Sequence, residues 1–347
     1  MSYVSLVELI NGKYKIISIV GMAKNTGKTV TLNHLIGEAI DEGVTIGVTS
    51  TGRDGESLDL VSETEKPKIY VEEGTIVATT TETLPLGDAK IEIISVTDYR
   101  TPLGAIVIGR VKDSGYIQIA GPQTVKETKE VCDMMLDLGA DFVIVDGAID
   151  RMSSAAPSVS EGTILSTGAT LSRDINKVVE ETLHVISLFR LPEIEDEKAK
   201  GIIENLMTEG KIAVIDQNYE VKHIKVKTAL SCGSIIGDHI KEDSKYVVLP
   251  GSLVKNTIED IMRTTRRYKN VKIIVKDGTK IFIEPRDWLR FMAYGVKVEV
   301  LKSIDLIAIT TNPYAPQGYY FDPKEFVEKM KNYIKDIPVF DVIFGGE

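Results

Sequence analysis

A nine-residue loop between an expected strand and an expected helix constrains this chain more than any other feature. Residues 15–20 are rich in β-branched side chains, as a buried parallel strand requires. Apolar residues recur at helical spacing over residues 29–43, and residues 44–49 have the pattern of a second strand. The connecting loop reads Gly21-Met22-Ala23-Lys24-Asn25-Thr26-Gly27-Lys28-Thr29. These segments predict a strand–loop–helix–strand unit with a right-handed parallel crossover.

The composition of this loop is typical of a site that cradles phosphates. A tight turn before a helix aims backbone N–H groups inward, and the helix N-terminus adds partial positive charge. Gly27 lets the backbone approach a phosphate, Lys28 is placed to reach the β- and γ-phosphates, and the Thr29 hydroxyl is a magnesium ligand. We therefore predict binding of a nucleoside triphosphate with Mg²⁺. The expected binding residues are Gly21, Ala23, Lys24, Asn25, Thr26, Gly27, Lys28, Thr29 and Val30.

The spacing of the loop departs from the strict phosphate-loop motif, because five residues rather than four separate Gly21 from Gly27. A structural glycine turn followed by a chance Lys-Thr pair is the alternative. The strand before the loop and the helix after it favour phosphate binding, because they supply the context that the motif requires.

Two acids are candidates for the magnesium side of the site. Asp146 follows four apolar residues at 142–145, where the tip of a parallel strand would present a carboxylate to Mg²⁺. Asp54 lies in the Gly- and acid-rich stretch 51–56 directly after the second strand, next to Arg53, which would touch phosphate. The alternatives are an ordinary strand end and a plain polar turn. We predict Lys28, Asp54 and Asp146 as catalytic residues, and Thr29, Asp54 and Asp146 as metal ligands.

The loop and the Asp146 segment resemble a known branch of P-loop NTPases. Gly, five residues, then Gly-Lys-Thr-Val is similar to the loop of dethiobiotin synthetase and the cobyrinic acid amidases, and Val145-Asp146-Gly147-Ala148 is similar to a magnesium-binding stretch of the synthetase. Asp54 matches its other acid. The septum-site group of this branch has a signature lysine at the position of Ala23, whereas the lysine here is Lys24. The dimer mechanism that uses this lysine in trans is therefore not implied, although a homodimer remains open.

Over its whole length the chain resembles a bacterial family found with adenosylcobalamin-dependent lysine 5,6-aminomutase, the small subunit of its reactivase. The stretches that carry this resemblance are residues 52–56, 120–122, 146–151, 165–169 and 311–313. The resemblance implies ATP-driven exchange of damaged cobalamin, with a MutS-like large subunit or the cobalamin enzyme as partner.

The rest of the chain predicts an α/β fold in two domains. Residues 66–121 contain short β segments separated by turn residues, which indicates a β-rich insertion in a first P-loop domain over residues 1–190. A proline and a run of charges at 191–200 mark the most plausible boundary, although these charges also fit one face of a short helix. Alternating strands and helices over residues 200–347 predict a second, C-terminal α/β domain for partner or substrate recognition.

Composition excludes several classes of protein. A net charge of −10 argues against a general nucleic-acid binder, and the basic stretch 263–269 has the pattern of a solvated helix end. Cys132 and Cys232 lie far apart, and the four histidines are scattered, so neither a disulfide framework nor a zinc site is expected. The apolar stretches are too short to cross a bilayer, and the N-terminus lacks the pattern of a signal peptide. We expect a cytoplasmic protein without membrane association.

Three functions remain open from the sequence. Nucleotide hydrolysis drives the remodelling of a partner protein, or a phosphate is transferred to a small carboxylate or hydroxyl, or the nucleotide is a static structural element. The first is favoured, with loops near Asp54 and 146–154 ordering on the γ-phosphate. The chain lacks the Asn-Lys-x-Asp stretch with which GTPases read guanine, since Asn176-Lys177 is followed by two valines. ATP is therefore favoured over GTP.

Overall fold

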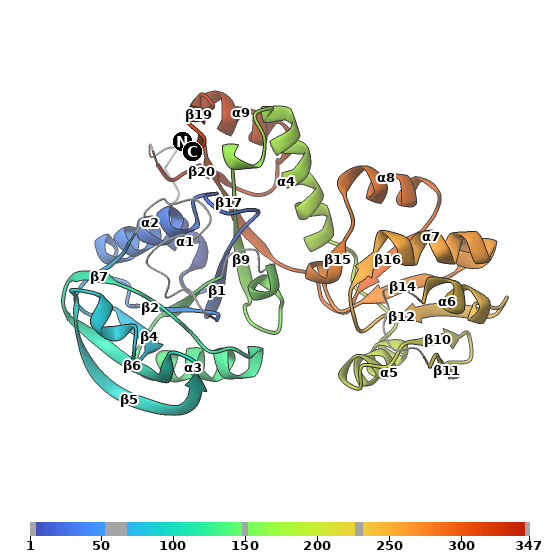
Figure 1. Ribbon diagram of the computed structural model, residues 1–347, viewed down its shortest axis with the longest axis horizontal. Coiled ribbons are helices and arrows are strands. Elements are labelled where there is room, and N and C mark those ends of the chain that lie inside the picture. Colours follow the sequence, from blue (N-terminus) through green and yellow to red (C-terminus); the bar gives the residue numbers. More distant parts are fainter. Residues whose placement is uncertain (1–4, 53–67, 148–151, 226–231, 344–347) are drawn as a thin grey trace. The chain divides into compact units, whose positions relative to one another are not determined.

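The computed structural model describes residues 5–52, 68–147, 152–225 and 232–343. The chain divides into two compact units (Figure 1). The first unit comprises Met1–Leu183 together with Asp305–Glu347, and the second comprises His184–Ile304. The first unit is therefore discontinuous in sequence, because the chain leaves it for the second unit and then returns.

A large mixed sheet forms the centre of the first unit. Within the described residues it has nine strands, and the first seven in spatial order run parallel to one another. The eighth strand is antiparallel to both of its neighbours, the seventh and the ninth. In that order the strands are β20 (Val339–Asp341), β17 (Leu306–Asn312), β9 (Gly162–Gly168), β1 (Ile16–Gly21), β8 (Phe142–Asp146), β2 (Ile46–Ser50), β4 (Ile76–Thr80), β6 (Gly104–Asp113) and β5 (Lys90–Thr101). The predicted strand at 15–20 is β1, and apolar side chains on both of its faces are buried, as a central parallel strand requires.

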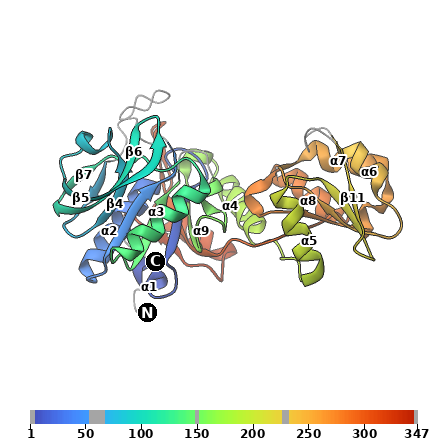
Figure 2. The ribbon, with the colours of Figure 1, turned by 90° about the horizontal axis from the view of Figure 1, so that it is seen from below.

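Helices cover both faces of this sheet (Figures 1 and 2). On one face α1 (Leu6–Ile10) and α2 (Lys28–Asp41) bury Leu6, Leu32 and Leu35 against alternate residues of β1 and β8. On the other face α3 (Val125–Asp137) packs Val131, Cys132 and Met135 against β4, β6 and β8. The remaining helices of the unit are α4 (Ile175–Phe189), which extends into the second unit, and α9 (Pro323–Tyr333), which packs against β17 and β20.

The β-rich stretch predicted at 66–121 extends the parallel sheet. It contains β4, β5 and β6, the short 3₁₀ segment Leu84–Leu86, and an antiparallel pair formed by β3 (Ile69–Val71) and β7 (Gly115–Ile117). β5 is the edge strand of the large sheet, and its pairing with β6 is interrupted by bulges. Such bulges bend an edge strand and disrupt its pairing surface.

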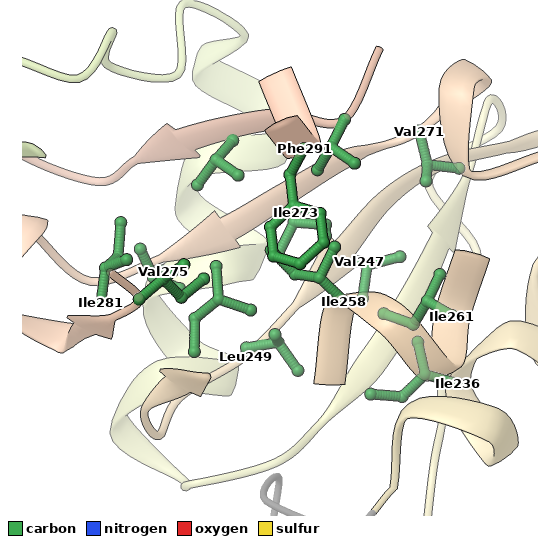
Figure 3. Close-up of a cluster of buried hydrophobic side chains, with 14 of the residues drawn as sticks. Ile236, Val247, Leu249, Ile258, Ile261, Val271, Ile273, Val275, Ile281 and Phe291 are labelled. Atoms are coloured by element: carbon green, nitrogen blue, oxygen red, sulfur yellow. The ribbon is translucent and has the colours of Figure 1, made fainter. Parts of the chain in front are cut away.

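The second unit is a smaller α/β layer structure with its own core. Its five-stranded sheet has the order β11 (Val221–His223), β10 (Ala213–Asp216), β12 (Ser244–Val248), β14 (Lys272–Val275) and β16 (Lys297–Val300), and the last three strands are parallel. One face packs against α6 (Gly233–His239), α7 (Lys255–Thr264) and α8 (Pro285–Ala293), with Phe291, Ile273 and Val247 at the centre (Figure 3). The other face packs against α5 (Glu197–Thr208).

The structure corrects two sequence expectations about the domains. Residues 200–347 do not form one C-terminal domain, because β17 pairs with β9 and β20 pairs with β17 in the first sheet. The pattern of β17 marks a buried strand, but it does not encode which sheet that strand joins. The charge run at 191–200 also leads into α5, whose N-cap Asp196 accepts a hydrogen bond from the backbone N–H of Ala199. The alternative of a short helix is therefore the one observed.

None of the helices in the described part of the chain is long and apolar enough to span a bilayer.

Candidate phosphate-binding site

The loop 22–27 leaves the C-terminal end of β1 and enters α2, whose first residue is Lys28. Two residues of the loop have left-handed backbone conformations: Asn25 with a φ of 63° and Gly27 with a φ of 96°. Gly27 is the N-cap of α2, and no side chain caps the helix there. Alternation of this kind turns successive N–H groups toward a common point, and the first N–H groups of a helix have no intrahelical partner. The loop therefore has the backbone shape of an anion cradle.

Lys28 folds back across the start of the loop. A Cβ atom built on Gly21 would lie 3.0 Å from both Cγ and Cδ of Lys28 and 2.5 Å from the Thr26 hydroxyl. The Lys28 ammonium donates a hydrogen bond to the carbonyl of Gly147, directly after β8. Glycine at position 21 thus leaves room for the lysine to cross the loop and to place its charge at the tip of the neighbouring strand.

Asp146 ends β8 beside the phosphate loop. In the parallel register it pairs with Ile19 of β1 on one side and with Ser50 of β2 on the other. Asp146 is 7% exposed, and its backbone carbonyl accepts hydrogen bonds from the Ser50 hydroxyl and the Thr51 N–H. The prediction that Asp146 lies at a strand tip next to the loop strand is therefore confirmed in position. Its role as a metal ligand stays a prediction.

The chain leaving β2 is held at the same edge of the sheet. The Gly52 N–H donates to the carbonyl of Pro122, and a Cβ on Gly121 would overlap the carbonyl oxygen of Ser50. The Thr51 hydroxyl is buried and has no hydrogen-bond partner within the described residues. Buried hydroxyls normally have partners, so this atom suits a polar ligand or a neighbouring segment. The predicted ligand Asp54 and its neighbour Arg53 lie outside the described residues.

The structure adds one residue that sequence reasoning did not place here. Asn312, at the end of β17, donates from its side-chain amide to the carbonyl of Asn25 at 2.9 Å. Under the loop, the hydroxyls of Thr31, Ser166 and Thr310 hydrogen-bond one another, with 2.9 Å between Thr31 and Thr310. The motif Thr311-Asn312-Pro313 was visible in the sequence, but the expected domain boundary assigned it to the other unit.

The oxygen donors that Thr29 and Asp146 would offer at this site suit magnesium better than a soft metal. Thr29 and Val30 lie in the first turn of α2, so Thr29 would offer a hydroxyl and Asp146 a carboxylate. No group of three His, Cys, Asp or Glu side chains in the part of the chain that the structure describes could hold a metal ion alone. Mg²⁺ is commonly held by one or two protein oxygens together with phosphates and water, so this donor set fits it.

The two cysteines take no part in this chemistry. Both are buried, and burial raises the pKa of the Cys132 thiol to about 12 and that of Cys232 above its usual value. A thiol is reactive as the thiolate, so neither residue is a nucleophile near neutral pH. Each cysteine packs among buried hydrophobic side chains, Cys132 in the first unit and Cys232 in the second.

Comparisons with known proteins add little to this geometry. No protein-family model matches the chain, and no curated protein matches it. One solved structure, described as ParA of pNOB8 bound to nonspecific DNA, is similar over 84% of this chain and 88% of its own chain, at 11% identity and a TM-score of 0.24. A TM-score this low supports no argument about fold or function, so the assignment of the site rests on its own residues.

Proposed function

We propose that the chain binds ATP with Mg²⁺ at the loop 21–30 and hydrolyses it. The observation that carries this proposal is the combination of a left-handed Gly27 at an uncapped helix N-terminus with a Lys28 side chain that crosses Gly21 toward the tip of β8. Each of these features has a direct use in holding a polyphosphate, and they occur together at the carboxyl edge of a parallel sheet, where ligands of such folds bind.

Each residue of the site has a definite task in this proposal. The loop N–H groups hold the phosphate oxygens, and Lys28 exchanges its contact with the Gly147 carbonyl for contacts with the β- and γ-phosphates. The Thr29 hydroxyl and the Asp146 carboxylate hold Mg²⁺, directly or through water, with Asp54 as a further ligand. When bound, the metal neutralises charge on the transferring phosphate. Positioning and charge compensation account for most of the catalysis of phosphoryl transfer.

We infer further that hydrolysis remodels a partner protein. The resemblance to the small subunit of an aminomutase reactivase supports this use, with a cobalamin enzyme and a MutS-like subunit as the partners. The second unit, residues 184–304, has its own core and sheet, so it has the size and independence of a recognition module. Basal hydrolysis would then be slow and would rise severalfold with the partner.

The proposal is tested by comparing two lysines that make the same kind of contact. Lys28 donates to the carbonyl that follows β8, whereas Lys15 donates to the Asp141 carbonyl that precedes β8, at the opposite edge of the sheet. Loss of the Lys28 charge should weaken Mg-ATP binding by about 10-fold to 100-fold. Lys28→Ala should also abolish hydrolysis, and Lys15→Ala should bind as the wild type does, as measured by titration calorimetry.

Equal binding by both variants would show that the loop is not the nucleotide site. Stoichiometric phosphorylation or ligation of a small carboxylate, with no stimulation by a protein partner, would replace remodelling by a synthetase-like reaction.

A further inference from the structure

We propose that Asn312 is a positioning residue that holds the phosphate loop in its phosphate-accepting conformation. This inference rests on the proposed nucleotide binding and goes beyond it, because it assigns part of the site to a strand that enters the first unit more than 280 positions later in the sequence.

The loop needs an external support because its conformation is costly. Asn25 has a φ of 63°, a left-handed conformation that asparagine tolerates better than most non-glycine residues but still adopts at a cost. Such a conformation persists where the surrounding structure holds it. Gly27 avoids that cost, but it also leaves the backbone free to move. Without support, we expect this loop to adopt other conformations, in which its backbone N–H groups do not point toward a common centre.

Asn312 contacts both of these residues. Its side-chain amide nitrogen donates to the Asn25 carbonyl at 2.9 Å, and its Cβ lies 3.2 Å from the position that a Cβ on Gly27 would occupy. In a trans peptide the carbonyl and the next N–H point in opposite directions. Holding the Asn25 carbonyl toward Asn312 therefore directs the Thr26 N–H away from Asn312. The contact fixes the orientation of one peptide group in the loop.

Asn312 is itself held at both ends of its side chain. Its Oδ1 accepts a hydrogen bond from the Tyr314 N–H at 3.0 Å, while its Nδ2 donates to Asn25, and only one orientation of the amide satisfies both contacts. Its backbone lies against Gly168 of β9, where a Cβ would come within 2.7 Å of the Asn312 carbonyl oxygen. We call the hydrogen bond from the Asn312 side chain to the Asn25 carbonyl the brace. It is anchored to the sheet through the backbone of Asn312, and both ends of the side-chain amide are held in place.

Two substitutions separate this role from others. Asn312→Asp keeps an oxygen that accepts from Tyr314 but removes the donor to Asn25, and Asn312→Ala removes both contacts. The exposed Gln317 lies in the following turn, and Gln317→Ala serves as the control. The affinity of each protein is measured for Mg-ATP, Mg-GTP and magnesium with inorganic triphosphate, which has no base.

Loss of one supporting hydrogen bond should weaken binding about 3-fold to 10-fold in Asn312→Ala. Asn312→Asp should lose more, because it places a carboxylate opposite the Asn25 carbonyl. The loss should be the same for all three ligands, since the brace acts on the phosphate cradle. Amide hydrogen exchange over residues 22–28 should also become faster in both variants without ligand, with no change in Gln317→Ala.

The outcomes distinguish the brace from the function on which it rests. A loss confined to ATP and GTP, with full triphosphate affinity, would make Asn312 a base-contacting residue and overturn the brace. Wild-type affinity and wild-type exchange in both variants would overturn it as well, while leaving nucleotide binding intact. Failure of the wild-type protein to bind any triphosphate would overturn both proposals together.

Discussion

Each unit of the chain places a lysine at the first position of a helix that follows a parallel strand, and the two lysines have different surroundings. Lys28 begins α2 after a left-handed Gly27, and its ammonium donates to a backbone carbonyl. Lys255 begins α7 after Val254, whose backbone is extended, and its ammonium forms an ion pair with Asp287 at 2.9 Å. Neither helix has a side-chain cap.

The difference lies in how each loop uses its backbone. In the second unit the residues before α7 form the short strand β13 (Leu253–Val254), which pairs with β15 (Ile281–Phe282). The backbone before α7 is therefore extended and hydrogen-bonded to a neighbouring strand. The charge of Lys255 is balanced by the carboxylate of Asp287 in α8. In the first unit the loop curls and its lysine faces a neutral carbonyl. A helix N-terminus alone is common, whereas a curled loop whose lysine donates to a neutral carbonyl is suited to bind an anion.

Ligand-linked stability should separate the two units most strongly. At 100 times its dissociation constant, Mg-ATP should stabilise the first unit by about 2.7 kcal/mol. Trp288, the single tryptophan, is buried in the core of the second unit, so its fluorescence during urea unfolding reports on that unit. This transition should not shift with nucleotide, whereas hydrogen exchange in β1 and α2 should slow. An equal shift in the Trp288 transition would mean that the units unfold as one.

Substitution of the two N-cap residues, Gly27 and Val254, should have different consequences for nucleotide binding. Gly27→Ala places a Cβ on a residue with a φ of 96° and 3.2 Å from the Cβ of Asn312. Keeping the loop in its present shape should then cost about 2 kcal/mol, and the free energy of nucleotide binding should weaken by a similar amount. Val254→Ala should leave the affinity for Mg-ATP unchanged. Titration calorimetry on both variants checks this pair, and similar losses in the two would show that the loops are not distinct in function.

The second unit should have an acid-sensitive support of its own. Lys245, which donates to Asp196, lowers the pKa of that carboxyl to about 2, and the Ala199 N–H and Tyr219 hydroxyl also donate to it. Because the folded pKa lies below the usual value of 3.8, this contribution to stability is complete above about pH 5 and is lost as the pH falls toward 2.

Asp196→Asn should remove this pH dependence, and Asp196→Ala should destabilise the second unit by about 1 kcal/mol at neutral pH through loss of the helix cap. Urea unfolding followed by Trp288 fluorescence at pH 6 and pH 3 measures both effects. Retention of the full wild-type acid dependence in Asp196→Asn would assign it to other groups.

The smallest effect should follow from breaking the ion pair at α7. The Lys255 ammonium holds the pKa of Asp287 below its usual value, but the pair is partly exposed to solvent, which screens it. Asp287→Asn should change the Trp288 unfolding midpoint little and should not create nucleotide binding at Lys255. If this variant bound triphosphate, the Asp287 carboxylate, and not the extended backbone before α7, would be what keeps the N-terminus of α7 from binding an anion as α2 is proposed to do.

Local patterns predicted the elements of this fold better than their assembly. The β1, α2, β2 and β8 segments were all expected close to their observed positions, because the periodicity of buried side chains and the signals that end a helix depend on neighbouring residues. The charge run at 191–200 was expected to mark a domain boundary, with a short helix as the alternative, because a charged first turn and a charged connection have the same local pattern. The return of β17 to the first sheet was missed because its buried pattern suits either sheet.

The site divides in the same way. The sequence determined the loop 21–29, the glycines that shape it, the lysine and the acid at the tip of β8, since the motif needs only a strand, a turn and a helix in succession. Only the tertiary structure decided that Lys28 meets the Gly147 carbonyl and that Asn312 supports Asn25. These contacts join residues far apart in the chain, and their position depends on which strands pair. Strand order is set by the packing of the whole sheet, which no local pattern contains.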